Sequence, residues 1–181
     1  MSVDMGRQRL DKGYVQIYTG DGKGKTTAAL GLALRAAGHG MYTYVAQFMK
    51  GRPYGELKAL SGHPCITIEQ YGDVHCIRRE EITPEHVARA HRGLEGAREA
   101  MHSGRYDLVV LDEINVAIWF GLVGVEDVLA LLESRPANVE VILTGRGAPQ
   151  QLIDRADLVT EMQELKHYYQ QGVTAREGIE W

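Results

Sequence analysis

The sequence has little cysteine and no long apolar run. Its 181 residues include two cysteines, Cys65 and Cys76, which form no Cys-x-x-Cys pair. A disulfide scaffold or a zinc ribbon is therefore not expected, and we expect two reduced thiols. No apolar run approaches the roughly 20 residues that span a bilayer. The polar start, residues 1–12, contains no signal-peptide core. We therefore expect a cytoplasmic location and no membrane partner.

The sequence also lacks an excess of positive charge. Lys and Arg number 20 and Asp and Glu number 24, so the formal net charge is −4. Domains that grip nucleic acid through its phosphates are usually basic, so no nucleic-acid partner is expected. The patterns His-Glu-x-x-His, Gly-x-Ser-x-Gly and Ser-x-x-Lys are absent. Their absence excludes the commonest zinc-protease, hydrolase and β-lactamase arrangements.

What the sequence contains is an alternation of strand and helix patterns. The length fits one domain, which we place at residues 13–181 after a polar N-terminal arm of residues 1–12. The expected strands cover residues 14–19, 41–48, 65–70, 108–111, 139–144 and 158–162. The expected helices cover residues 26–37, 54–60, 83–101, 125–132 and 149–156. This alternation predicts an α/β three-layer sandwich with a mostly parallel central sheet.

A glycine-rich loop between the first strand and the first helix is the strongest signal. The run Thr19-Gly-Asp-Gly-Lys-Gly-Lys-Thr-Thr27 follows a strand and opens a helix, as a Walker A loop does. The expected sandwich therefore resembles the P-loop NTPase-like fold. Its backbone N–H groups can surround phosphate oxygens at a helix N-terminus. Lys25 adds a full positive charge, and the Thr26 hydroxyl can bind a magnesium ion. The usual first glycine is Thr19 here, with Gly20 one place later, and Lys23 is an additional lysine.

The matching acidic motif ends a buried strand. Leu108-Val-Val-Leu-Asp-Glu113 has the Walker B pattern, in which apolar residues precede two carboxylates. One acid can bind magnesium directly or through water opposite Thr26. The other can orient a water molecule or a substrate hydroxyl.

Further blocks extend the pattern beyond the two Walker motifs. They are Gln47-Phe-Met-Lys-Gly51, Thr144-Gly-Arg-Gly147, Lys166-His167 and Gly172-Val-x-Ala-x-x-Gly-Ile179. Together with residues 20–29 and 109–113, this ordered set resembles the P-loop ATP:corrinoid adenosyltransferases, also called cob(I)alamin or cob(I)yrinic acid a,c-diamide adenosyltransferases. The resemblance runs from about residue 13 to residue 181.

The resemblance implies a transferase that uses ATP as co-substrate and Mg²⁺, or Mn²⁺, as cofactor. A cobalt(I) corrinoid attacks the 5′ carbon of the ATP ribose, and tripolyphosphate leaves. The implied ATP-binding residues are Gly20, Asp21, Gly22, Lys23, Gly24, Lys25, Thr26 and Thr27. The implied catalytic residues are Lys25, Glu113 and Asp112, with Thr26 and Glu113 as the metal ligands and Asp112 as a supporting acid.

The corrinoid pocket and the partners are also implied by the resemblance. Some members place a Phe and a Trp where this chain has the segment 71–76, so Tyr71 and His75 are the nearest candidates for the pocket. His167 and Tyr169 form a second candidate wall. A flavin-dependent reductase is implied as the electron donor, and a homodimer as the oligomeric state.

Two other functions share the same loop. An ATP-dependent kinase or hydrolase would act at the γ-phosphate and release orthophosphate or a phosphorylated product. A non-catalytic, ATP-gated corrinoid carrier would bind ATP without turnover. Such a carrier would not need the acids Asp112 and Glu113, so their presence favours the enzyme.

Overall fold

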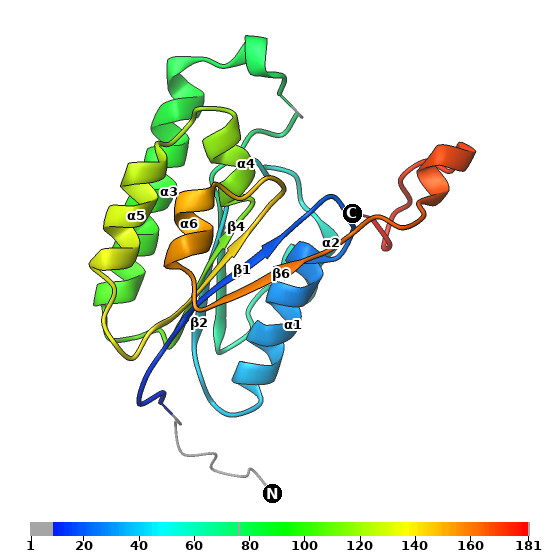
Figure 1. Ribbon diagram of the computed structural model, residues 1–181. Coiled ribbons are helices and arrows are strands. Elements are labelled where there is room, and N and C mark those ends of the chain that lie inside the picture. Colours follow the sequence, from blue (N-terminus) through cyan, green and yellow to red (C-terminus); the bar gives the residue numbers. More distant parts are fainter. Residues whose placement is uncertain (1–8, 76, 181) are drawn as a thin grey trace, which may run out of the picture.

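The computed structural model describes residues 9–75 and 77–180, which form a six-stranded parallel sheet with helices on both faces (Figure 1). The strand order is β3-β2-β4-β5-β1-β6. The strands are β1 (Val15–Thr19), β2 (Thr43–Gln47), β3 (Ile66–Gln70), β4 (Leu108–Asp112), β5 (Glu140–Thr144) and β6 (Leu158–Glu161). Every pairing in this sheet is parallel. The α/β three-layer sandwich expected from the sequence is confirmed.

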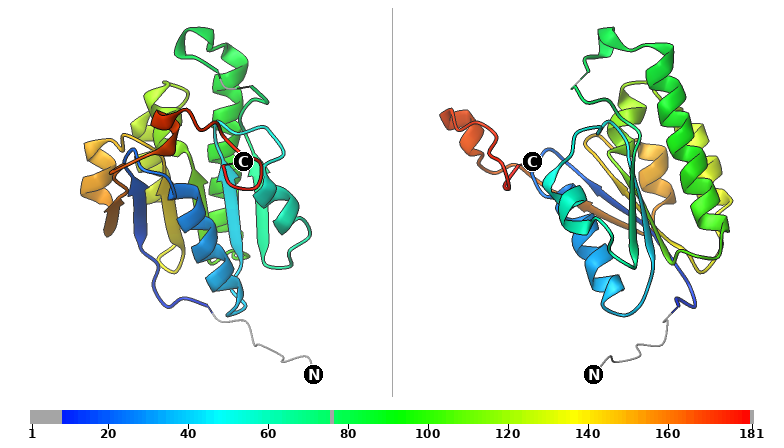
Figure 2. Two further views of the ribbon diagram at one scale, coloured as in Figure 1. Left: turned by 90° about the vertical axis from the view of Figure 1, so that its right-hand side faces the viewer. Right: turned by 180° about the vertical axis from the view of Figure 1, so that it is seen from behind.

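The helices divide between the two faces of the sheet (Figure 2). They are α1 (Lys25–Ala37), α2 (Gly55–Leu60), α3 (Pro84–His102), α4 (Ile114–Trp119), α5 (Val125–Glu133) and α6 (Gln150–Arg155). Two short 3-10 helices, η1 (Arg79–Glu81) and η2 (Tyr168–Gln171), lie in loops. Figure 1 shows α1 on one face and α3, α5 and α6 on the other.

The side chains of β4 pack against helices on both faces of the sheet. Leu108 and Val110 pack into the cluster that contains the apolar side of α1. Val109 and Leu111 pack into the larger cluster under α3, α4 and α5. All five residues of β4 are buried. Because successive side chains in a strand point to opposite faces, a continuous apolar run is what a central parallel strand requires.

The boundaries of the strands and α-helices agree with the sequence to within a few residues, and α4 and the two 3-10 helices were not predicted. Strand β2 is shorter than the expected 41–48, and helix α3 starts as expected after Thr83 with Pro84 at its first position. The Thr83 backbone N–H donates to His86 Nδ1 at 3.0 Å, which satisfies one group at the helix start. Helix α4 was not predicted, because its six residues directly follow the acidic motif without a turn residue such as Gly or Pro.

The arrangement gathers the motifs at one edge. The carboxyl ends of parallel strands lie together, and ligands of such sheets bind there. Thr19, Gln47, Asp112 and Thr144 end β1, β2, β4 and β5 at this edge. Cys65 is a free thiol, as expected, whereas Cys76 lies outside the described residues. Within residues 9–75 and 77–180, no helix is long and apolar enough to cross a membrane.

Candidate functional site

The glycine-rich loop connects β1 to α1 with the backbone that only glycine adopts easily. Gly24, directly before α1, has φ 117°. Gly22 donates its N–H to the Met162 carbonyl at 2.7 Å. A Cβ on Gly22 would lie 2.7 Å from that same carbonyl oxygen, so a larger residue would push the loop away from the end of β6. The expected strand-loop-helix context of a Walker A loop is therefore present.

Lys25 lies inside the curve of this loop. The residue is 7% exposed, and its ammonium donates to the carbonyl oxygens of Gly20 and Gly22, each at 2.7 Å. Burial lowers the pKa of Lys25, and the nearby charge of Glu113 opposes that shift. The loop thus holds one positive charge at its centre, next to the first turn of α1, where the helix dipole also favours an anion.

The Asp112 carboxylate accepts four hydrogen bonds beneath the loop. It ends β4, is 1% exposed, and its Oδ1 accepts the Thr26 hydroxyl at 2.8 Å and the Thr144 hydroxyl at 2.7 Å. Its Oδ2 accepts Gln47 Nε2 at 3.2 Å and Lys50 Nζ at 2.9 Å. Asp112 is therefore the acid that touches the hydroxyl group of the loop.

Glu113 points into the pocket instead. Its backbone is left-handed, with φ 63°, and this residue directly precedes α4. Burial, and then the charge of Asp112, raise the pKa of Glu113, while Lys50 and Lys25 oppose the shift. Within the described part of the chain, no hydrogen bond joins its carboxylate to Thr26. The pairing of Thr26 with Glu113 as metal ligands therefore stays a prediction.

Met49 is the other described non-glycine residue with a left-handed backbone, with φ 58°. It follows β2, the strand next to β4 in the sheet. Both left-handed turns, at Met49 and Glu113, thus lie beside the contact between Lys50 and Asp112.

Lys50 is a site residue that sequence reasoning missed. Its ammonium lies 2.9 Å from Asp112 Oδ2 and 3.1 Å from Thr26 Oγ1, with 14% of the side chain exposed. Glu56 Oε1 lies 3.9 Å away, and the centre of the Tyr54 ring lies 5.4 Å away. The signal was available, because Lys50 belongs to the block Gln47–Gly51 that directly follows a strand.

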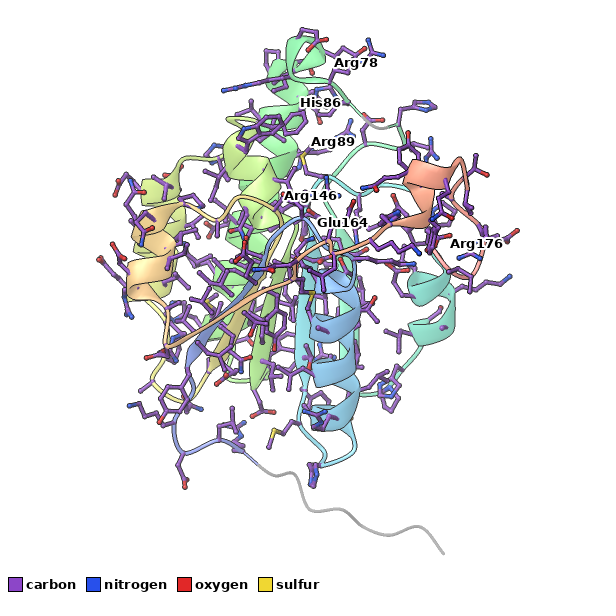
Figure 3. All side chains as sticks on the ribbon, turned by 45° about the vertical axis from the view of Figure 1, so that its right-hand side comes forward. Arg78, His86, Arg89, Arg146, Glu164 and Arg176 are labelled. Atoms are coloured by element: carbon purple, nitrogen blue, oxygen red, sulfur yellow. The ribbon has the colours of Figure 1, made fainter. Side chains whose placement is uncertain are left out.

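A cavity of about 860 Å³ opens over these groups. The loop and the start of α1 form one wall, with Lys50, Glu56, Glu113 and Arg146 around it. Its apolar lining includes Leu30, Leu34, Tyr54, Val116 and Ile179. Figure 3 labels Arg146 at the carboxyl edge of the sheet. The cavity therefore joins a cationic loop to an apolar wall, as a nucleotide requires.

The C-terminal segment, residues 163–180, reaches this cavity after leaving the sheet (Figure 1). Lys23 donates to the Ile179 carbonyl and to Glu180 Oε1, each at 2.9 Å. Glu180 also accepts the Tyr168 hydroxyl, and its Oε2 accepts the Arg176 backbone N–H at 2.7 Å. Arg176, Tyr168 and Lys23 together hold the pKa of Glu180 well below its usual range. Figure 3 labels Arg176 on this segment.

The four candidate corrinoid residues lie in two places. Tyr71 packs beside Phe48 and hydrogen-bonds Glu69 and Tyr44, and burial raises its pKa to about 12. His75 is exposed on the loop after β3. His167 lines the cavity and Tyr169, on η2, is 72% exposed. The assignment of these residues to a corrinoid pocket stays a prediction.

The residues that could hold a magnesium ion are oxygen donors. The described residues contain no group of three or more His, Cys, Asp or Glu placed to hold a metal. Thr26 and Glu113 nevertheless line the cavity, and Asp112 accepts the Thr26 hydroxyl from behind, so a hydroxyl and two carboxylates lie close together. Mg²⁺ is usually bound by one or two carboxylates together with substrate phosphates and water, so this donor set fits it.

Comparisons with known proteins agree with this geometry. The family model for ATP:corrinoid adenosyltransferase BtuR/CobO/CobP matches residues 11–181. A corrinoid adenosyltransferase from Sinorhizobium sp is 38% identical over 175 residues, which cover 94% of this chain and 81% of that protein. The corrinoid adenosyltransferase CobA of Salmonella typhimurium is 36% identical over 174 residues, which cover 94% of this chain and 87% of that protein.

A solved structure supports the fold alone. The flagellar accessory protein FlaH from Methanocaldococcus jannaschii aligns with a TM-score of 0.57 at 15% identity. The alignment covers 87% of this chain and 74% of that chain.

Proposed function

The chain belongs to the ATP:corrinoid adenosyltransferase family, and we propose that it transfers the 5′-deoxyadenosyl group of ATP to the cobalt(I) of a corrinoid, with release of tripolyphosphate. In this reaction the cobalt supplies both electrons of the new cobalt–carbon bond. The bond between the ribose 5′ carbon and its oxygen breaks, and its electron pair leaves with the triphosphate. The protein's tasks are then to align the two substrates and to stabilise the charge of the leaving group.

The observation that carries the proposal is the cationic loop at the cavity. Lys25 is held at the centre of the curve, and residues 21–26 of the loop line the cavity. Lys23 lies at the mouth of the cavity. Two lysines and a helix N-terminus suit an anion larger than a single transferred phosphoryl group. This supports the intact triphosphate as the leaving group.

The metal ion is part of the proposal. Thr26 and Glu113 would hold Mg²⁺, or Mn²⁺, and the position of Asp112 on the Thr26 hydroxyl supports a share for that acid as well. When bound, the ion neutralises charge on the triphosphate. Thr144 and Gln47 keep the Asp112 carboxylate oriented toward Thr26.

The partners are a further part of the proposal. We propose that the cobalt is reduced by a flavin-dependent reductase and that the protein is a homodimer. Light scattering on the purified protein measures its oligomeric state, and a monomer at micromolar concentration would contradict the homodimer. The corrinoid would lie against the cavity wall that contains His167, with Tyr169 nearby, or against the loop with Tyr71 and His75.

An anaerobic reaction tests the function. The protein is incubated with ATP, magnesium and chemically reduced cobalamin, and the absorption change of a forming cobalt–carbon bond is recorded. Phosphorus NMR of the same mixture then identifies the second product. We expect tripolyphosphate in a one-to-one ratio with the adenosylated corrinoid.

The alternatives appear as other outcomes of the same reaction. ADP and orthophosphate formed in step with turnover would overturn the adenosyltransferase proposal and favour a kinase or hydrolase. Binding of ATP and corrinoid with no product would favour a carrier.

A further inference from the structure

An ammonium group occupies the position where the loop would bind its metal ion. Lys50 Nζ lies between Asp112 Oδ2 and Thr26 Oγ1, at 2.9 and 3.1 Å. Those two oxygens belong to residues that would hold the cation under the proposed function. In the free protein, therefore, the positive charge at this position comes from a side chain.

The ammonium and a divalent cation cannot share these oxygens. Like charges at such a distance inside a partly buried site repel strongly, because little water screens them. Metal binding therefore requires Lys50 Nζ to leave Asp112. The carbonyl of Lys50 accepts the Gly72 N–H at 3.0 Å, which anchors its backbone, so we expect the side chain to move.

The ammonium of Lys50 could contact a triphosphate bound in the same cavity. Its four-carbon stem is flexible, and Lys50 lines the same cavity as the loop. Glu56 at 3.9 Å is too distant for a hydrogen bond to replace the one with Asp112. A triphosphate in the cavity would offer the ammonium several strong acceptors.

We infer that Lys50 is a positioning residue for the proposed reaction: it neutralises Asp112 in the free protein and moves to the triphosphate when a metal–nucleotide complex enters. The metal then arrives together with the triphosphate rather than ahead of it. This inference rests on the proposed function for the identity of the anion.

Binding of Mn²⁺, measured by electron paramagnetic resonance, tests the inference without any catalytic turnover. The wild-type protein should bind Mn²⁺ weakly alone and at least tenfold more tightly with tripolyphosphate. Lys50→Met should bind Mn²⁺ alone about tenfold more tightly than wild type, because an ammonium no longer competes. The same variant should bind metal-free tripolyphosphate about tenfold more weakly, which corresponds to one lost charged contact.

Two further variants serve as controls. Lys58→Met makes the same charge change on the exposed face of α2, and it should behave as wild type in both titrations. Lys50→Met leaves the buried Asp112 carboxylate without the lysine and could destabilise the fold. Lys50→Gln removes the same positive charge but keeps a hydrogen-bond donor for Asp112, so we expect it to fold.

Clear results would overturn the inference. Equal Mn²⁺ binding by the wild-type protein with and without tripolyphosphate would overturn it, and this result does not depend on whether the variants fold. Folded Lys50 variants that bind Mn²⁺ no more tightly than Lys58→Met would also overturn it. Because neither titration contains a corrinoid, failure here is distinguishable from failure of the adenosyl transfer.

A second inference comes from a different contact, at the mouth of the cavity. Glu180 places a carboxylate on Lys23 at 2.9 Å, and both residues line the cavity. Only 15% of the Glu180 side chain is exposed, because Arg176 and Tyr168 also surround it. The geometry points to Glu180 as a tethered anion that occupies Lys23 until a triphosphate displaces it.

Calorimetric titration with tripolyphosphate tests this contact. Glu180→Gln should bind about threefold to fivefold more tightly than wild type, a gain typical of releasing one exposed ion pair. Glu177→Gln removes the same charge from an exposed side chain three residues away and should leave the affinity unchanged. Equal affinities for the two variants, or weaker binding by Glu180→Gln, would overturn the inference.

Discussion

The two lysines of the phosphate loop are two residues apart and are held in opposite ways. Lys25 is 7% exposed and donates to carbonyl groups of its own loop. Lys23 has a side chain that is 44% exposed and pairs with Glu180, which lies 157 residues further along the chain. Burial lowers the pKa of Lys25, whereas the bond to Glu180 raises the pKa of Lys23.

The comparison separates local from distant causes. The contacts of Lys25 arise within five residues, so any chain that forms this loop will form them. The contacts of Lys23 require the whole C-terminal segment to return to the loop (Figure 2). We therefore expect Lys25 to be essential and Lys23 to adjust binding.

The largest expected effect is that of Lys25→Ala. Turnover should fall by about a hundredfold or more, because one preorganised charge at the leaving group is lost. The steady-state rate of cobalt–carbon bond formation measures it. Lys58→Ala, on the exposed face of α2, is the matched control. A near wild-type rate for Lys25→Ala would show that the loop does not bind the triphosphate.

Glu113→Gln tests the acid whose charge faces Lys25. The magnesium concentration for half-maximal activity should rise by on the order of tenfold, because a carboxamide is a weaker ligand than a carboxylate for this hard cation. Corrinoid affinity, measured by spectral titration, should not change. An unchanged magnesium dependence would assign the metal to Asp112 alone.

Lys23→Ala should have a smaller effect than either of these. The affinity for ATP should fall about fivefold or less, since an exposed charge contributes at most about 1 kcal/mol. Calorimetric titration of wild type and variant gives the ratio of their affinities for ATP. If Lys23→Ala impaired the protein as strongly as Lys25→Ala, the proposed difference between an essential Lys25 and an adjusting Lys23 would be wrong.

The smallest effect concerns stability and its dependence on pH. Burial raises the pKa of Glu113 above its ordinary value, so ionisation of this group opposes folding. Its favourable contribution is present below the unfolded pKa and is lost as pH rises through the folded pKa. Glu113→Gln should therefore gain stability relative to wild type between pH 4 and pH 8 in urea unfolding. If the difference in unfolding free energy between the variant and wild type stayed constant from pH 4 to pH 8, the raised pKa of Glu113 would be contradicted.

Part of this site could be predicted from the sequence, and the limits have physical reasons. The loop and its helix are local, so glycine spacing and the following helix pattern identify them. The sequence places Asp112 and Glu113 side by side but does not say which one meets Thr26. That choice depends on where β4 ends and on the left-handed turn at Glu113.

Lys50 shows the same limit at longer range. It meets Asp112 because β2 and β4 are neighbours, with Gln47 paired to Asp112 in register. Sheet order is set by packing of the whole domain, and no local pattern in the sequence encodes it. The return of the C-terminal segment to Lys23 is missed for the same reason. The all-parallel sheet was predictable because strand and helix alternate along the chain.

The left-handed turns at Met49 and Glu113 have a consequence for the engineering of this protein. Each costs about 1–2 kcal/mol relative to an ordinary backbone, and such strain is typical of functional sites. A screen that selects only for a higher melting temperature would therefore favour glycine in place of Glu113, whereas the packing of Met49 against the core opposes its replacement. Replacement of Glu113 would raise heat resistance and remove the acid from the cavity. Selection for thermal stability and selection for turnover should consequently diverge first at Glu113.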